Sequence, residues 1–185
     1  MLATDTTATR NESLGLARDL GWLDRVMEAA VAEQRAAAGE MLPGVYISEG
    51  EVDEILDRPS LFAGADNGAL ELPQGWFSRR LNDLVDRCRL QPFDAAALLV
   101  VLAQGMDRRY GRLYAYLQDD LTKPFATPGL ALDLLCRGFI AKAELRSRFA
   151  PTAPLMALGL LQLGGDEMQA LRVRPLQIDD HLAAY

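Results

Sequence analysis

The sequence predicts a mainly α-helical protein with a small β-hairpin close to its C-terminus. Apolar residues recur at steps of three and four along most of the 185 residues, and Pro and Gly separate the periodic segments. Apolar and polar residues alternate in residues 161–163 and again in residues 171–178. Steps of three and four predict amphipathic helices, whereas a period of two predicts strands. Half of the residues are hydrophobic and 24% are charged, which is the balance of a globular protein.

The N-terminal part is predicted to contain a leader, two helices and a loop. Residues 1–12 are rich in Thr and Ala without an apolar period and are expected to be a flexible leader. Residues 13–39 show an amphipathic helical pattern that ends at a glycine. Residues 48–57 begin with Ser and have Glu three positions later, the spacing of a capping box, so a short helix is expected there. Residues 59–75 contain Gly, Pro and Asn-Gly, which favour a loop.

Two further helices are predicted around residue 90. The first covers residues 77–88, has one apolar and one charged face, and is stopped by Pro92. The second covers residues 95–104 and is apolar on every side, so it should be buried all round. Asp94 is placed to cap this helix, and Gly105 suits a left-handed exit from it.

The next helix is predicted to begin after Asp107, which can cap it. Tyr116 lies off the apolar stripe of this helix and should be exposed. Asp119 and Asp120 would occupy the last turn, where the helix dipole disfavours negative charge. Asp119 or Asp120 is therefore expected to contact an arginine or a backbone N–H. The stripe itself recurs at helical spacing and consists of Tyr110, Leu113, Tyr114, Leu117 and Leu121.

The remaining elements follow the order of a winged helix-turn-helix. Thr127 and Pro128 suit the cap and the first position of a helix. Two more helices and a hairpin follow, with Gly164-Gly165-Asp166 as a turn inside the hairpin, which would be the wing. The predicted ranges are 127–135, 142–149, 153–158 and, for the hairpin, 161–178.

These elements divide the chain into three parts. Residues 1–12 form the leader, residues 13–91 an N-terminal helical region and residues 92–185 a winged-helix domain. Asp179 would cap a final helix that is cut short at Tyr185, so the sequence is expected to be an N-terminal fragment.

One stretch resembles a known family. Residues 109–120 read Arg-Tyr-Gly-Arg-Leu-Tyr-Ala-Tyr-Leu-Gln-Asp-Asp, and residues 127–136 read Thr-Pro-Gly-Leu-Ala-Leu-Asp-Leu-Leu-Cys. In their residue types and the order of these residues, both segments resemble the N-terminal winged-helix domain of bacterial AAA+ ATPases of the kind associated with contractile injection systems. This resemblance implies a domain that positions a client, an adaptor or a neighbouring subunit for an ATPase motor, and oligomerisation through that motor.

The motor itself is absent from the sequence. A phosphate-binding loop ends in Gly-Lys-Ser/Thr, and neither Lys123 nor Lys142 follows a glycine. ATP and magnesium are therefore expected only with the missing motor, and this chain is expected to have no cofactor. A single histidine, His181, cannot build a catalytic triad or a metal cluster. Cys88 and Cys136 lack metal-ligand spacing and are expected to be core residues of a cytoplasmic, non-membrane protein.

Two functions remain open, protein recognition and DNA binding. A DNA-reading helix presents Arg, Lys, Asn or Gln to base edges, and residues 152–158 contain none of these. The net charge of −7 also disfavours nucleic acid, although the wing carries arginines. A protein partner is therefore expected, because aromatic, Met and Arg side chains are enriched at protein interfaces. The candidate interaction residues are Tyr116, Met156, Arg172 and Arg174.

Overall fold

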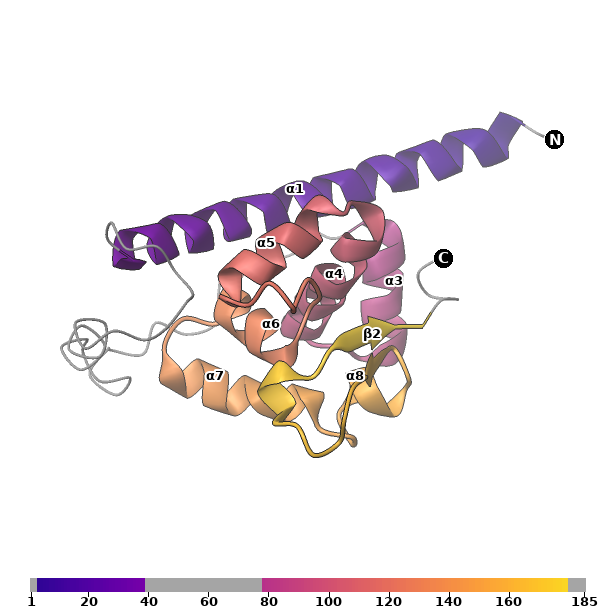
Figure 1. Cartoon of the computed structure of the whole chain (residues 1–185). Coiled ribbons are helices and arrows are strands. Elements are labelled where there is room, and N and C mark those ends of the chain that lie inside the picture. Colours follow the sequence, from indigo (N-terminus) through magenta and orange to yellow (C-terminus); the bar gives the residue numbers. More distant parts are fainter. Residues whose placement is uncertain (1–2, 39–77, 180–185) are drawn as a thin grey trace, which may run out of the picture.

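The computed structural model describes residues 3–38 and 78–179 (Figure 1). This part of the chain is mainly helical and carries one antiparallel pair of strands, which confirms the predicted fold class. The predictions for residues 48–57, for residues 59–75 and for a helix after Asp179 lie outside the described residues. The elements are α1 (Ala3–Ala38), α3 (Arg79–Cys88), α4 (Pro92–Met106), α5 (Arg109–Leu117), α6 (Pro128–Leu135), α7 (Phe139–Leu145), η1 (Arg146–Phe149), α8 (Pro154–Ala157), β1 (Leu161–Leu163), η2 (Leu171–Val173) and β2 (Leu176–Ile178).

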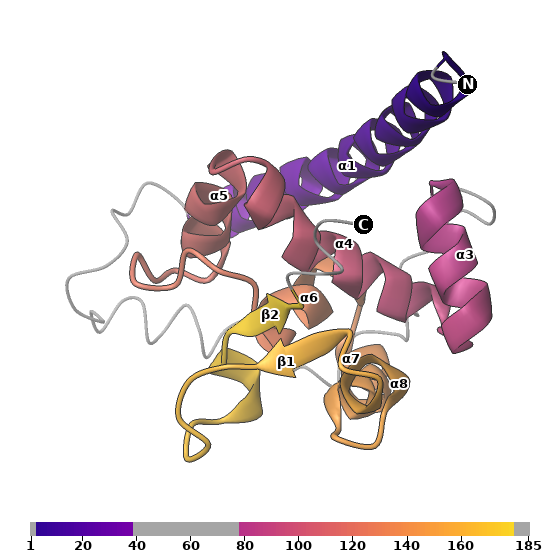
Figure 2. The same cartoon turned by 90° about the vertical axis from the view of Figure 1, so that its right-hand side faces the viewer.

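Helix α4 is the centre of the described structure. Its residues from Phe93 to Val101 are all buried, as the apolar run predicted. Helices α1, α3, α5 and α6 and strand β2 pack around it. Figure 2 shows α1 and α5 on one side of α4, with α8 and the hairpin on the other. Because every face of α4 is covered, the elements before and after it share one hydrophobic core.

Helix α1 is longer than the sequence predicts. It begins at Ala3 and therefore includes residues 3–12, whereas the helical pattern of the sequence begins at residue 13. The flexibility expected of the leader stays a prediction. Trp22, Leu23 and Met27 anchor the helix in the core, while its N-terminal part extends past the other helices (Figure 1). Extending a formed helix is much easier than starting one, and residues 3–12 contain neither Pro nor Gly to stop it.

A buried carboxylate joins α1 to the start of α3. The backbone N–H of Ser78 donates to Asp19 Oδ2 over 2.6 Å, and the Asp19 side chain is almost completely buried. Gly15 lies one turn earlier, where a Cβ atom would come within 3.0 Å of Ser78 Cβ. Asp19 Oδ1 has no hydrogen-bond partner among the described residues, and the guanidinium of Arg18 is 3.9 Å away. Burial raises the pKa of Asp19, against the smaller lowering effect of the hydrogen bonds from Ser78.

Asp19 should make stability depend on pH. Because its pKa is higher in the folded than in the unfolded chain, the folded chain takes up the proton first as the pH falls. The stability that protonation of Asp19 contributes is therefore lost as the pH rises through the folded-state pKa of Asp19. We expect wild type to gain stability relative to Asp19→Asn as the pH falls towards the unfolded-state pKa of about 3.9. Urea unfolding of both proteins between about pH 4 and pH 7 checks this, and a pH-independent difference would contradict it.

The ends of α4 differ in detail from the prediction. Asp94 is the third residue of the helix and not its cap: Gln91 is the cap, and its N–H donates to Asp94 Oδ2 over 2.8 Å. Gly105 lies inside the helix and has no positive φ, because α4 continues to Met106. Asp107 then accepts the N–H of Arg109 over 2.8 Å, which fits its predicted role at the start of α5.

The elements after residue 126 have the winged-helix order. Thr127 Oγ1 accepts the N–H of Leu130 and Pro128 is the first residue of α6, as predicted. The second helix starts earlier than expected, as α7, and ends as the 3-10 helix η1. The third, α8, is a single turn, and Gly159 leaves it with φ +68°.

The hairpin is shorter than its apolar alternation suggests. Leu161 pairs with Ile178, Gln162 with Gln177 and Leu163 with Leu176. Residues 171–173 form η2 instead of a strand. Pro175 follows and has no N–H for a strand ladder, although its carbonyl accepts the N–H of Gly164 over 2.8 Å. The wing is therefore a two-stranded hairpin whose connection contains the short helix η2.

Candidate functional site

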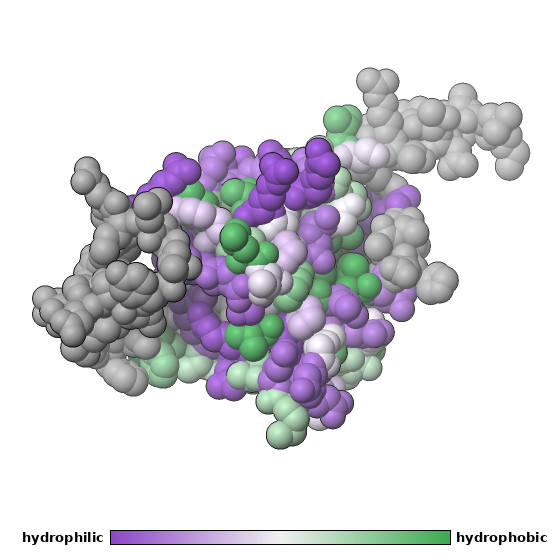
Figure 3. All heavy atoms as spheres, in the orientation of Figure 1, coloured by the Kyte–Doolittle hydropathy of each residue, from purple (hydrophilic) through white to green (hydrophobic). Residues whose placement is uncertain are grey.

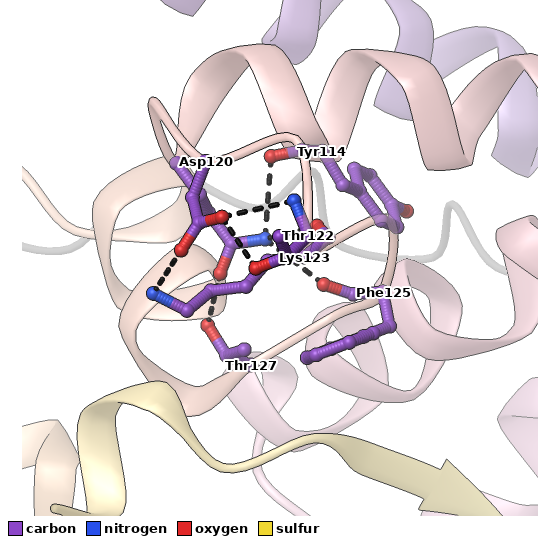
Figure 4. Close-up of polar contacts among 7 residues, drawn as sticks. Tyr114, Asp120, Thr122, Lys123, Phe125 and Thr127 are labelled. Carbon is purple, nitrogen blue, oxygen red and sulfur yellow. Dashed lines mark hydrogen bonds and ion pairs between the residues drawn. The ribbon is translucent and has the colours of Figure 1, made fainter. Parts of the chain in front are cut away.

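A network centred on Gln118 fixes the connection between α5 and α6 (Figure 4). Gln118 Nε2 lies 3.2, 3.1 and 2.9 Å from the carbonyl oxygens of Tyr114, Lys123 and Phe125, which share its two N–H donors. Its Oε1 accepts the hydroxyl of Thr127 over 2.7 Å. A flipped amide would face these carbonyls with an oxygen, so the orientation is determined chemically. Gln118 and Thr127, which belong to the two segments that resemble the AAA+ family, thus hold this connection in one conformation.

Replacing Gln118 should loosen this connection. A glutamate in its place could still accept from Thr127 but could not donate to the three carbonyls. We expect Gln118→Glu to lower the free energy of unfolding by about 1–2 kcal/mol, since carbonyls lose donors and meet a negative charge. Amide hydrogen exchange should quicken in residues 119–126 before it quickens in α4. Gln162→Glu is the matched control, because this residue lies on the exposed face of β1. Equal effects of the two substitutions would contradict the assigned role.

Asp119 and Asp120 lie after α5 and not in its last turn, because the helix ends at Leu117. Asp119 is exposed and left-handed, with φ 49°. Asp120 Oδ1 accepts the N–H of Thr122 over 2.9 Å, and Oδ2 is 2.8 Å from Lys123 Nζ. These contacts, the one from Lys123 foremost, lower the pKa of Asp120 to about 2. The backbone N–H contact expected for one of the two residues is present at Asp120, although the cation is a lysine and not an arginine.

Helix α5 buries one face and exposes another. Tyr110 and Tyr114 are fully buried, and the Tyr114 hydroxyl donates to the carbonyl of Val100 over 2.6 Å. Burial raises the pKa of both phenols. Tyr116 is 37% exposed, as its position off the stripe predicts. Leu121 is 91% exposed, so its predicted place in the core is wrong: the helical period stops where Asp119 turns the chain.

Helix α8 holds the position of the reading helix but lacks its features. It consists of Pro154, Leu155, Met156 and Ala157, without a donor for base edges. Met156 is partly buried against the core, so the candidate interaction residue serves mainly packing. Leu158, the next residue, is exposed instead.

The wing arginines contact their own chain. Arg172 pairs with Asp133 Oδ2 over 2.5 Å, and the other oxygen of Asp133 binds Lys142 Nζ over 2.7 Å. The Arg172 side chain nevertheless stays 61% exposed. Arg174 donates from Nε to the carbonyl of Gly164 and from an Nη atom to that of Leu163, both at 3.2 Å. Arg174 thus joins the segment before β2 to the end of β1 by hydrogen bonds.

A further cation of the winged-helix part is held by α4. Arg148 Nε donates to Asp94 Oδ1 over 2.9 Å, and an Nη atom contacts Oδ2 of the same carboxylate. Asp94 is fully buried. The hydrogen bond to Asp94 raises the pKa of Arg148. This guanidinium of η1 is therefore turned inward.

The candidate interaction residues do not form one surface. Tyr116 lies on α5, whereas Met156 and the two arginines belong to α8 and the wing region across α4 (Figure 2). Sequence reasoning missed Gln118 and Asp133 as organising residues, and it assigned Asp94 to the start of α4 without its contact to Arg148. Their partners are distant in sequence or are backbone carbonyls, and neither leaves a local pattern.

The described residues contain no group of three or more His, Cys, Asp or Glu side chains that could hold a metal ion. Cys136 is buried, and burial raises its pKa to about 11, while Cys88 is half-buried. None of the helices in the described ranges has the length and apolar character that crossing a bilayer requires.

Comparison with known proteins places this architecture in a family. The family model described as "Winged helix domain, variant" matches residues 65–185, which is more than half of the chain. The match includes α3 and every later element, and α1 precedes it. The division of the chain at residues 91 and 92 stays a prediction. No curated protein and no solved structure matches the chain. The chain therefore belongs to the variant winged helix domain family.

Proposed function

We propose that this winged helix domain is a non-catalytic module that recognises protein. Winged helix domains bind DNA or protein. The observation that favours protein is the state of the DNA-reading elements: α8 is one apolar turn, and Arg148, Arg172 and Arg174 all bind groups of their own chain. A reading helix needs exposed donors that reach base edges, and phosphate contacts need available cations.

The resemblance over residues 109–136 supports a more specific context. In this proposal the domain belongs to a bacterial AAA+ ATPase associated with a contractile injection system, and it positions a client, an adaptor or a neighbouring subunit for the motor. The full-length protein would be cytoplasmic, would oligomerise through the motor and would bind ATP and magnesium there. Residues 1–185 themselves would neither bind nor hydrolyse ATP.

A DNA titration tests the choice between the two ligand classes. We expect a pool of labelled DNA duplexes to bind weakly and without sequence preference, with Kd above ~1 μM at physiological salt and rapid loss of binding as salt increases. Sequence-selective binding tighter than this would favour the alternative, a winged-helix DNA-binding module.

The protein-recognition role and the motor context need separate tests. Proteins captured from the native host on immobilised residues 1–185 would be identified by mass spectrometry, purified and titrated with the chain. A saturable complex supports recognition, and failure of every purified candidate to bind would count against it. The coding sequence beyond Tyr185 tests the context: a Gly-x-x-x-x-Gly-Lys-Ser/Thr motif supports the motor, and its absence removes that part of the proposal.

A further inference from the structure

Two cations on the exposed face of helix α5 have no partner among the described residues. Arg108, Arg112 and Tyr116 are all exposed and follow one another at steps of four residues. Arg108 has helical backbone angles, so the three side chains form one line along the helix surface. Neither Arg108 nor Arg112 has a side-chain hydrogen bond or an ion pair with another residue of the described ranges. We call these three residues the α5 stripe.

The positions of these two charges are electrostatically unfavourable within the described structure. Two like charges four residues apart on a helix repel each other, and cations at a helix N-terminus oppose the helix dipole. The first turn of α5 contains no acidic residue to offset them. Arg109, which lies beside the α5 stripe, differs: it pairs with Asp24 Oδ2 over 2.6 Å and stacks on the ring of Tyr110. The described part of the chain therefore supplies a carboxylate for Arg109 but none for Arg108 and Arg112.

We propose that the α5 stripe binds an acidic segment of a protein partner. Two guanidinium groups would each pair with a carboxylate, and Tyr116 would pack against an apolar side chain of the segment. Met106, exposed at the end of α4 and two residues before Arg108 in the sequence, offers a second apolar side chain. Figure 3 shows hydrophobic residues scattered among hydrophilic ones on the face of the molecule where α5 lies, which suits a charged segment better than a broad apolar interface. This inference rests on the proposed protein-recognition function and names the chemistry of the partner.

The surroundings of the α5 stripe favour a peptide over nucleic acid. Asp107 precedes the stripe and Asp119 follows it, and both side chains are exposed. The α5 stripe rises about 12 Å along the helix and its two cations lie about 6 Å apart along the axis, so they form a short track with a carboxylate at each end of the stripe. A nucleic-acid backbone continues its negative charge past both ends and would meet these carboxylates. An acidic peptide can confine its charges to the track, with carboxylates two residues apart in an extended chain about 7 Å from each other.

The test selects peptides from a displayed library of random 12-residue sequences with immobilised residues 1–185. We expect enriched peptides to contain two or more Asp or Glu and an apolar residue. Fluorescence anisotropy then compares binding of the best peptide to wild type, to Arg108→Glu/Arg112→Glu and to Arg137→Glu/Arg146→Glu. The last variant changes the net charge equally, at two exposed arginines outside α5. We expect the α5 variant to weaken binding at least 30-fold and the control variant less than 3-fold.

Further variants separate the possible outcomes. Arg108→Lys/Arg112→Lys keeps both charges but loses the planar fork, so it should bind with intermediate affinity. Circular dichroism and urea unfolding would show that each variant is folded. Equal weakening of peptide binding by both charge-reversal variants would show that only net charge matters and would overturn the proposal. Tighter binding of a DNA duplex than of any peptide, lost in the α5 variant, would also overturn it. If library peptides and purified partners bind but ignore the α5 variant, the α5 stripe is the wrong surface while protein recognition stands. If no peptide or protein binds, the proposed function itself fails.

Discussion

Replacing Asp94 by Ala is expected to lower the free energy of unfolding by about 3–5 kcal/mol, the usual cost of breaking a buried ion pair from one side. The Asp94 carboxylate is 0% exposed and the Arg148 side chain 18% exposed. One carboxylate binds the guanidinium at two positions and also accepts the Gln91 N–H at the start of α4. Its removal leaves a mostly buried cation without a counter-charge and a helix N-terminus without one acceptor.

Urea unfolding followed by circular dichroism measures this effect, and Asp133→Ala is the matched control. Asp133 is likewise a carboxylate in ion pairs, with Lys142 and Arg172, but its side chain is 39% exposed. Exposed ion pairs contribute about 0–1 kcal/mol, because water screens them and both side chains lose freedom. We expect the midpoint to fall far more for Asp94→Ala than for Asp133→Ala, with similar slopes.

A double-mutant cycle with Arg148→Ala separates the ion pair from the helix cap. The double variant should be less destabilised than the sum of the single variants, because the second substitution removes the cation that the first leaves unpaired. Equal small losses for Asp94→Ala and Asp133→Ala would show that burial does not strengthen the contact. Strict additivity in the cycle would assign the whole effect to the cap at Gln91.

Local signals in the sequence are sufficient for most helices of the winged-helix part. Thr127 and Pro128 mark the start of α6 because a hydroxyl cap and a fixed φ act within one helical turn. The apolar run of α4 predicts complete burial because no face of it is polar. Gly159 ends α8 through a positive φ that glycine adopts without strain. In each case the cause and its effect lie within a few residues.

Contacts between distant residues explain where the sequence predictions are wrong. Asp94 acts locally in the first turn of α4, where it accepts the Gln91 N–H, but its second role, binding Arg148 54 residues away, has no local signal. Leu121 continues the period of α5, yet the left-handed Asp119 ends the helix before it. Leu171-Arg-Val-Arg alternates like a strand and forms η2, because the packing of this segment against α6 determines its conformation. Tertiary contacts override local preference at these positions.

Among the candidate interaction residues, too, some features follow from the local sequence and others depend on distant contacts. The exposure of Tyr116 follows from its place off the apolar stripe of its own helix. The contacts of Arg172 and Arg174 do not follow from the sequence, because their partners lie on α6, at the end of β1 and in the turn that follows β1. Arg108 and Arg112 stand out only once the structure shows which arginines have carboxylates beside them.

Replacing Gly129 by Ala is expected to destabilise the protein by about 2–3 kcal/mol, although Ala normally stabilises a helix relative to Gly. Gly129 is buried in the first turn of α6, where η2 crosses it. A Cβ atom at this position would lie 2.5 Å from Arg172 Cγ and 2.7 Å from the Arg172 carbonyl oxygen. The side chain could rotate away, but the carbonyl belongs to the backbone, so η2 itself would have to move.

Gly105→Ala is the matched control, because Gly105 is also helical and a Cβ atom added there would meet no described atom within 4 Å. We expect this substitution to stabilise the protein by about 0.5–1 kcal/mol. The two variants thus make the same chemical change in two helices with opposite expected signs. Urea unfolding measures both.

Hydrogen exchange should locate the damage in Gly129→Ala. Amides of β1 and β2 should exchange faster, since the hairpin is joined to α6 through η2, while amides of α4 keep their protection because its other neighbours are unchanged. A stabilising effect of Gly129→Ala would mean that η2 moves at little cost. The contact between the wing and α6 would then be a loose one, and Arg172, its exposed cation, would be available to a partner after all.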